Sequence, residues 1–295
     1  MKKNILDWIT IALMAIVYIG FTSCGGDDDS SGTSGGGNSS KADGQSTGTF
    51  QGAKRVYGDN LVKATTSSTG SRWEFIYDAK GFMTNAKQTD ELNKSYEYKI
   101  SYSENVMTFS RYSNGKFKET RTASIGSNGF ISETIDDDET YTFTYDNAGH
   151  LTRFSIIEDG DVNDDVYLTW QNGNIISAIN QDKHPSTQTV SYKTDSQGPI
   201  VNTINLVDID HMASIDIDIE EFLIYAGAIG FGPTQLPLEI TNVKQYAGND
   251  NNQEKTETTI NSWKFDNKNR PISLERSTTV EGSSNKETKN YTWEY

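Results

Sequence analysis

The sequence predicts an all-β protein built as a meander of β-hairpins. Three observations predict it: aromatic residues recur at every second position, the runs end in Asp-x-x-Gly turns, and the unit repeats about every two dozen residues. In the run 73–78 (Trp-Glu-Phe-Ile-Tyr-Asp), the rings fall on one face of a pleated strand and Glu74 on the other. A sheet with one aromatic face must bury that face. The meander therefore rolls into a barrel or folds as two packed sheets.

The turn chemistry supports each hairpin in order. The side chain of Asp78 or Asp146 can cap its turn, and the glycine three residues later takes the positive φ that a type I turn with a bulge requires. Asn269 replaces glycine in the last copy, and asparagine is the next best residue there. We expect roughly 14–18 strands. The weaker copies and further turns are residues 127–130, 168–175, 195–198 and 263–270.

Cys24, the only cysteine of the chain, stands where a bacterial lipoprotein is cleaved and acylated. The apolar run before it, residues 5–21, is shorter than the roughly 20 residues of a membrane span. Residues 21–24 (Phe-Thr-Ser-Cys) resemble a lipobox, which implies a signal peptide over residues 1–23 and lipidation of Cys24. The alternative is a buried core cysteine behind an ordinary signal or anchor helix. Without a second cysteine, no intrachain disulfide can form.

Residues 24–48 are predicted to be a lipidated flexible linker. They consist almost entirely of Gly, Ser, Thr, Asp and Asn, a composition that buries too little apolar area to become ordered. Such a coil reaches about 25–30 Å. The acidic run Asp27–Asp29 resembles the export signal of Bacteroidota lipoproteins, which implies the outer membrane and the cell surface.

Residues 49–295 are long enough for one β domain with a single core. Without residues 1–23, the chain has 24 basic and 40 acidic residues, a net charge of −16. This balance excludes nucleic acid and anionic membrane surface as favoured partners.

The Tyr-Asp-x-x-Gly units resemble the YD repeats of large bacterial surface proteins. Behind a lipobox, the pattern over about residues 50–295 is similar to a domain of unknown function with a porin-like fold, found in Bacteroidota lipoproteins. This resemblance implies an up-and-down antiparallel β-barrel-like fold. It brings no activity and no cofactor with it.

One segment, about residues 204–240, breaks the alternation and is the most apolar stretch of the domain. Residues 214–228 fit a short helix with Ser214 as N-cap. Against this reading, residues 215–220 alternate like a strand. We expect an irregular or short helical insert that closes one mouth of the barrel or plugs its interior. A role in packing is favoured over ligand gating.

The candidate metal ligands form weak patterns. Asp159, Asp161 and Asn163 begin like a calcium loop, but the glycine and the final glutamate of that motif are missing, so an acidic hairpin tip is favoured. Asp216 and Asp218 belong to an acidic cluster over residues 208–221, which could bind calcium or hold a general acid and base. The single histidines lack zinc-site spacing, and no catalytic or nucleotide-binding motif occurs in the sequence.

These observations favour a lipid-anchored cell-surface domain that binds an extracellular glycan or protein, or has a structural role, and performs no chemistry. The first alternative is a surface hydrolase acting on glycans through a carboxylate pair. The second is a transmembrane barrel, because Tyr291, Trp293 and Tyr295 resemble the C-terminal signal of outer-membrane barrels. Such barrels need strands of about 10 residues with an apolar outer band. The strands expected here are shorter. The aromatic residues lie on one regular face of these strands, which favours a role in core packing over stacking against sugars.

Overall fold

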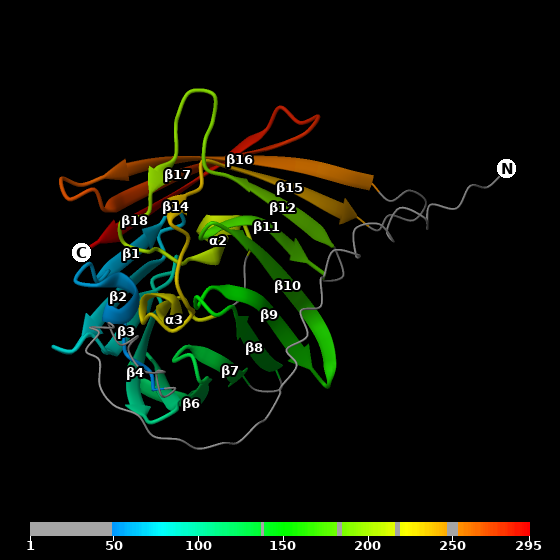
Figure 1. The fold of residues 1–295 in the computed structure, drawn as a ribbon. Coiled ribbons are helices and arrows are strands. Elements are labelled where there is room, and N and C mark those ends of the chain that lie inside the picture. Colours follow the sequence, from blue (N-terminus) through cyan, green and yellow to red (C-terminus); the bar gives the residue numbers. More distant parts are fainter. Residues whose placement is uncertain (1–48, 137–138, 182–184, 216–218, 247–252) are drawn as a thin grey trace, which may run out of the picture. The chain divides into compact units, whose positions relative to one another are not determined.

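The computed structural model describes residues 49–136, 139–181, 185–215, 219–246 and 253–295. Sixteen antiparallel strands close into one barrel, and two further strands, β13 and β14, pair in a separate small sheet (Figure 1). Strand β1 pairs with β18 to close the barrel. Apart from this pair and the pair β12–β15, all barrel neighbours are consecutive in the sequence. The predicted all-β, up-and-down barrel of 14–18 strands is therefore confirmed.

The elements are short helices and strands of two to 13 residues. None of the helices in the described part of the chain is long and apolar enough to cross a membrane. The elements are α1 (Lys54–Tyr57), β1 (Ala64–Ser67), β2 (Arg72–Tyr77), β3 (Met83–Thr89), β4 (Ser95–Ser103), β5 (Val106–Ser113), β6 (Lys116–Ile125), β7 (Ile131–Asp136), β8 (Glu139–Tyr145), β9 (Leu151–Glu158), β10 (Asp161–Gln171), β11 (Asn174–Asn180), β12 (Ser186–Ser191), β13 (Ile200–Val201), α2 (Ile209–Ala213), α3 (Glu221–Tyr225), β14 (Gln235–Leu236), β15 (Glu239–Tyr246), β16 (Gln253–Phe265), β17 (Pro271–Val280) and β18 (Lys286–Glu294).

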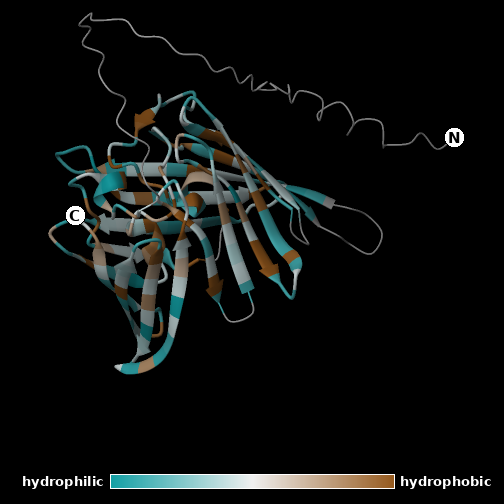
Figure 2. Ribbon diagram, turned by 60° about the horizontal axis from the view of Figure 1, so that its bottom comes forward, coloured by the Kyte–Doolittle hydropathy of each residue, from teal (hydrophilic) through white to brown (hydrophobic). Residues whose placement is uncertain are grey.

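Alternation along the strands separates an apolar interior from a polar exterior. In β4, Tyr98 and Ile100 are buried, whereas Lys99 between them is exposed. Hydrophobic and hydrophilic residues alternate along the strands in Figure 2. The buried aromatic side chains join the apolar residues of the insert in one cluster, so the hydrophobic core lies inside the barrel.

The hairpin turns use the chemistry that the repeat predicts. Two backbone amides donate hydrogen bonds of 2.9 Å to Asp78 Oδ1, and Gly81 adopts a φ of 88°. Asp146 and Asp266 each accept the same pair of bonds. Asn269 takes the place of glycine with a φ of 58°.

Two turns differ from the prediction. At the turn between β10 and β11, Asn172 and Gly173 both have positive φ, 51° and 71°, which makes a two-residue hairpin turn; the register shift of this hairpin lies between Thr169 and Trp170. The expected turn at 195–198 does not use Gly198, whose φ is not positive. Instead, the backbone amide of Gln197 donates a hydrogen bond to the side-chain hydroxyl of Thr194, the residue before the predicted turn. This bond closes the turn.

The aromatic residue that ends many of the even-numbered strands has a polar role that the sequence did not reveal. The O–H or N–H of this side chain donates a hydrogen bond to a backbone carbonyl near the start of the preceding strand. The bond ties the two neighbouring strands together. The pairs are Tyr77 with Val62, Tyr102 with Met83, Tyr145 with Ile131, Trp170 with Leu151, Tyr192 with Ile175 and Tyr295 with Pro271, at 2.7–2.9 Å.

A plug fills the barrel on one side. We define it as residues 50–63, which contain α1, together with the described residues of 202–234, which contain α2 and α3. Both helices lie within the ring of strands in Figure 1, and Phe222 packs against the rings of Trp73 and Phe109. The Tyr57 hydroxyl donates to the Ile224 carbonyl at 2.7 Å, which joins the two parts of the plug. The expected insert therefore lies inside the barrel.

The plug contacts the turns at one barrel end, which we call the plug end. Alternate turns of an up-and-down meander lie at the same end, so the turns that lead from even-numbered to odd-numbered strands all gather there. At five of these turns a carbonyl accepts a hydrogen bond from the plug: Gly81 from the Ala53 amide, Asn128 from the Arg55 guanidinium, Gly149 from the Phe231 amide, Gly173 from the Thr234 amide and Asn269 from the Thr203 hydroxyl.

The turns at the opposite end, which we call the open end, have different surroundings. A Cβ added to Gly149 at the plug end would lie 2.8 Å from Phe130 and 2.9 Å from Phe231. At the open end, a Cβ added to the turn glycines would meet no atom within 4 Å; these glycines are Gly70, Gly115, Gly160 and Gly282. Among the described barrel-turn glycines, close packing is thus found at the plug end and not at the open end.

The sequence prediction within the insert was wrong in detail. Asp208, not Ser214, is the N-cap of a helix, because the His211 backbone amide donates to the Asp208 side chain. Ser214 instead ends α2 in the left-handed conformation, with a φ of 55°. The insert contains two five-residue helices instead of one longer helix. Helix α1 was not predicted at all.

Candidate functional site

Three cavities lie between the plug and the inner barrel wall in the described part of the chain. We name them the Arg121 cavity, the His211 cavity and the Asn242 cavity, and their volumes are about 300, 230 and 450 Å³. Adjacent residues at the start of α3 separate the first two, since Glu220 lines the Arg121 cavity and Glu221 lines the His211 cavity. The plug therefore provides polar groups to each chamber of the lumen.

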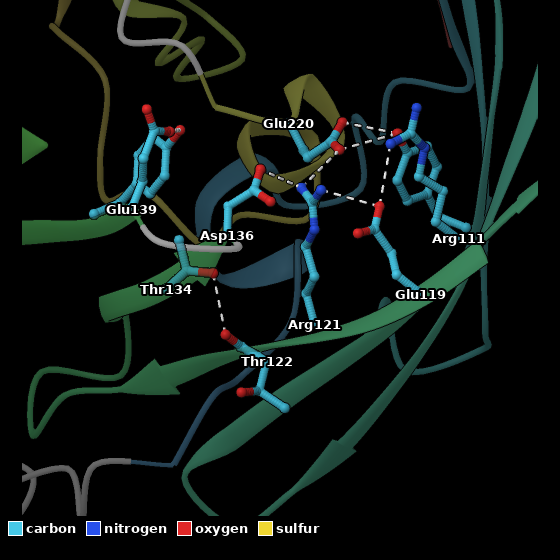
Figure 3. A network of polar contacts seen from close by, with 10 residues as sticks. Arg111, Glu119, Arg121, Thr122, Thr134, Asp136, Glu139 and Glu220 are labelled. Carbon is cyan, nitrogen blue, oxygen red and sulfur yellow. Dashed lines mark hydrogen bonds and ion pairs between the residues drawn. The ribbon is translucent and has the colours of Figure 1, made fainter. Parts of the chain in front are cut away.

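An ion network forms the wall of the Arg121 cavity (Figure 3). The guanidinium of Arg121 on β6 lies 3.0 Å from Glu119, 2.6 Å from Asp136 and 3.6 Å from Glu220. Arg111 on β5 donates to the same Glu119 oxygen at 3.1 Å. The network therefore ties the plug, through Glu220, to strands β5, β6 and β7.

Burial and charge shift the carboxyl groups of this network in opposite directions. Burial raises the pKa of Glu220, against the opposing effects of the Tyr98 hydroxyl and of Arg121. The Tyr98 hydroxyl lies 3.0 Å from both oxygens of that carboxyl group. For Glu119 burial acts the same way, but the two arginines outweigh it and hold its pKa below the ordinary value. Including Glu139, four carboxyl groups face two guanidinium groups here, so the cavity attracts hydrogen-bond donors and cations.

The His211 cavity contains a buried acid–histidine pair. His211 Nδ1 lies 2.6 Å from Asp208 Oδ2, and both side chains are 7% exposed. The Thr65 hydroxyl of β1 donates to Glu221 Oε1 at 2.8 Å. The ring of Tyr291 meets His211 edge to face, with 4.2 Å between the ring centres. Helix α2 and α3 thus present their acidic groups to the seam where β1 meets β18.

The two carboxyl groups of this cavity have pKa values that move apart. Burial and the charge of Asp208 raise the pKa of Glu221 to about 7. Burial would also raise the pKa of Asp208, but the charge of His211 and its hydrogen bonds hold it below the ordinary value. Burial lowers the pKa of His211, yet Asp208 outweighs that effect and raises it. Two neighbouring carboxyl groups with separated pKa values are the arrangement that acid–base catalysts use.

The Asn242 cavity runs from the plug to the open end. Asp210 and Ser214 line it on the plug, and Ser283 and Asn285 line it at the turn between β17 and β18. Its wall comes from strands β15 to β18 and is polar, apart from Val280 and the ring of Tyr291. Among the wall residues, Asn242, Thr259 and Arg276 are 5–7% exposed. Buried polar groups of this kind are retained where they have partners, either in the protein or in a ligand.

The acidic residues singled out in the sequence are distributed over different places. Asp208 and Glu221 meet in the His211 cavity, Glu220 joins the Arg121 network, and Asp210 lies 3.0 Å from Arg276. Cys24, Asp216 and Asp218 lie outside the described residues. Asp159, Asp161 and Asn163 are exposed at the hairpin tip between β9 and β10, where the Asn163 amide donates to Glu158. No group of three or more metal-ligating side chains was found in the described residues.

Sequence reasoning missed Arg121, Asn242 and Arg276, although the phase of the strands contains the necessary signal. In β16, Trp263 and Phe265 point inward, and extending that alternation backward places Asn261, Thr259 and Glu257 on the inner wall. Polar residues in phase with buried aromatic residues therefore mark the lumen. Which of them meet across the barrel depends on register, which the sequence alone does not determine.

Comparisons with known proteins agree with this architecture. A porin-like protein from Bacteroides uniformis, 15% identical, superposes with a TM-score of 0.59 over 79% of this chain and 97% of its own. One from Bacteroides vulgatus, 14% identical, gives 0.52 over 80% and 98%. At these identities the likeness shows the fold alone. No curated protein matches the chain. The model of the family "Domain of unknown function (DUF4595) with porin-like fold" matches residues 75–273, and the chain belongs to this family.

Proposed function

We propose that this protein is a lipid-anchored cell-surface domain that binds an extracellular ligand in the lumen of its barrel and performs no chemistry. The observation that carries the proposal is the Asn242 cavity, which extends from the plug to turn residues at the open end. A barrel filled by hydrophobic core at one end and lined by polar groups at the other is a rigid cup. Ligand sites are commonly found in the mouths of such barrels.

The outer surface of the barrel supports a position in water, outside the lipid bilayer. Outward residues of β4 are Glu97, Lys99 and Ser101. Other strands expose single apolar residues, such as Ile76 and Ile260. A transmembrane barrel needs the reverse, an apolar outer band on strands of about 10 residues. Several strands here are longer than the sequence suggested, with 13 residues in β16. Strand length therefore does not speak against a transmembrane barrel, whereas the polar residues on the outer face do. The lipid on Cys24 would provide the attachment instead.

The described chain enters the barrel at the plug end. Thr49 lies there, because its carbonyl would be 3.1 Å from a Cβ added to the turn residue Gly129. The open end, where Ser283 and Asn285 line the Asn242 cavity, is the other end of the barrel.

Localisation tests the anchoring part of this proposal. In cells, the wild-type protein should incorporate radiolabelled palmitate, fractionate with the outer membrane and be degraded by protease added to intact cells. The Cys24→Ala variant should incorporate no label. Palmitate labelling of Cys24→Ala, or full protection of the wild type from external protease, would contradict the proposal.

Binding is tested on residues 25–295, which keep the whole barrel with its own core. A ligand that binds only the folded state raises the melting temperature by mass action. Saccharides, uronic acids, polyamines and peptides should include at least one class that raises it. The rise should vanish when Thr278 in the lumen is replaced by Phe and persist when the exposed neighbour Thr279 is replaced by Phe. A shift that survives Thr278→Phe would place binding outside the lumen.

A surface hydrolase is the second candidate, and the His211 cavity is the observation that favours it. The acid pair would be Glu221, with a pKa of about 7, and Asp208, with a lowered pKa. If polysaccharide is cleaved and Glu221→Gln abolishes the cleavage while thermal unfolding shows that the variant is folded, the hydrolase replaces the binding proposal. Cleavage absent across neutral and acidic polysaccharides would remove this candidate.

A further inference from the structure

We infer that the Asn242 cavity is a binding site for a neutral saccharide of one or two sugar units. This inference rests on the proposed function, since it names the ligand class of the lumen. The lining of this cavity is electroneutral. Lys244 lies 3.0 Å from Glu257, Arg276 lies 3.0 Å from Asp210, and Lys289 lies 3.5 Å from Glu287, so the lining contains three bases and three acids, all of them paired.

An electroneutral lining distinguishes this cavity from the Arg121 cavity, where carboxyl groups outnumber guanidinium groups. A charged ligand entering the Asn242 cavity would lose hydration without gaining an unpaired countercharge. A neutral ligand avoids this cost. The paired charges still offer strong donors and acceptors to its hydroxyl groups.

Asn242 supplies the second, independent observation. It is 6% exposed, and it lines the cavity. Its Oδ1 accepts a hydrogen bond of 3.2 Å from Gln188 Nε2, and its own amide nitrogen has no partner in the described part of the chain. Solvent reaches that nitrogen at the wall of the cavity, so it can donate a hydrogen bond to a ligand there without breaking a bond within the protein.

The remaining wall adds hydroxyl groups and one ring. Thr259 and Thr278 form a hydroxyl pair at 2.9 Å, and Tyr291 contributes the aromatic side chain. Val280 is the one aliphatic residue of the lining. A wall this polar suits a ligand that carries hydroxyl groups over most of its surface. The volume of about 450 Å³ lies in the range of about 300–1,000 Å³ that ligand sites occupy.

The experiment measures sugar binding to residues 25–295 by ligand-observed NMR and calorimetry, at millimolar concentrations of glucose, galactose, maltose and lactose. Glucuronate and spermidine are the charged comparison probes. At least one neutral sugar should bind, and the charged probes should bind at least tenfold more weakly. Asn242→Ala should weaken the sugar at least tenfold, and the matched amide variant Asn290→Ala on the exposed face of β18 should leave binding unchanged.

A second variant, Thr278→Phe, fills the cavity and should abolish sugar binding while the unliganded melting temperature shows that the barrel is folded. Binding of none of the neutral sugars, or sugar binding that Thr278→Phe leaves intact, would overturn the inference. If glucuronate or spermidine binds instead and Thr278→Phe removes it, the saccharide inference fails while lumen binding stands. If every probe binds Asn242→Ala and Thr278→Phe as tightly as it binds the wild type, lumen binding fails as well.

Discussion

Substitution of Gly149 by Ala tests whether the plug is held by close contact with the repeated turns. Gly149 has a φ of 83°, and an added Cβ would approach Phe130 to 2.8 Å and Phe231 to 2.9 Å. Gly160 at the open end has nearly the same φ, 87°, with no atom within 4 Å of an added Cβ. The pair separates the cost of the left-handed backbone from the cost of displacing the plug.

The backbone cost applies to both variants and is about 1–2 kcal/mol for a non-glycine residue in this region. Overpacking against two aromatic rings adds about 1–3 kcal/mol, and only Gly149→Ala incurs it. Urea unfolding of residues 25–295 should therefore show that Gly149→Ala is about 1–3 kcal/mol less stable than Gly160→Ala. Equal free energies of unfolding for the two variants would refute the close contact between the plug and the turn.

Two further substitutions test individual groups. Because the folded-state pKa of Glu221 is raised from 4.5 to about 7, its contribution to stability is complete below pH 4.5 and is lost as the pH rises to about 7. Glu221→Gln should therefore gain roughly 2–3 kcal/mol relative to wild type between pH 4.5 and 8; parallel profiles from urea titrations would argue against the raised pKa. Tyr145→Phe removes the donor to the Ile131 carbonyl at 2.9 Å and should cost about 0.5–1.5 kcal/mol. Tyr112→Phe on the outer face should change thermal or urea unfolding much less, and an equal loss would remove the role assigned to the Tyr145 hydroxyl.

The repeat predicted most of the barrel because its signals are local. An aromatic residue at every second position and an aspartate before a turn act within one hairpin, so residues 73–81 and 141–149 could be interpreted without knowing their neighbours. Closure of the meander followed from the need to bury one face of every strand. The same local reasoning failed at Gly198, where the turn depends on Thr194 instead.

The candidate site could not be predicted in the same way because its groups meet across the barrel. Asn242 lies on β15 and Arg276 on β17, and Asp210 reaches Arg276 only because α2 enters the lumen. Helix α2 itself is five residues long, too short for a periodic signal. The aspartate cluster over residues 208–221 was noticed for its density, yet the structure divides its described members among three cavities.

The most direct test of the account is the accessibility of the lumen from the open end. Residues 25–295 contain no cysteine, so a single introduced thiol reports its own surroundings. Thr278→Cys lines the Asn242 cavity, Thr279→Cys lies on the exposed face of the same strand, and Ala228→Cys lies fully buried in the plug. In the native protein, a small maleimide should label Thr278→Cys within about tenfold of the rate at Thr279→Cys and leave Ala228→Cys unlabelled. Protection of Thr278→Cys to the level of Ala228→Cys would contradict an open, ligand-accessible lumen.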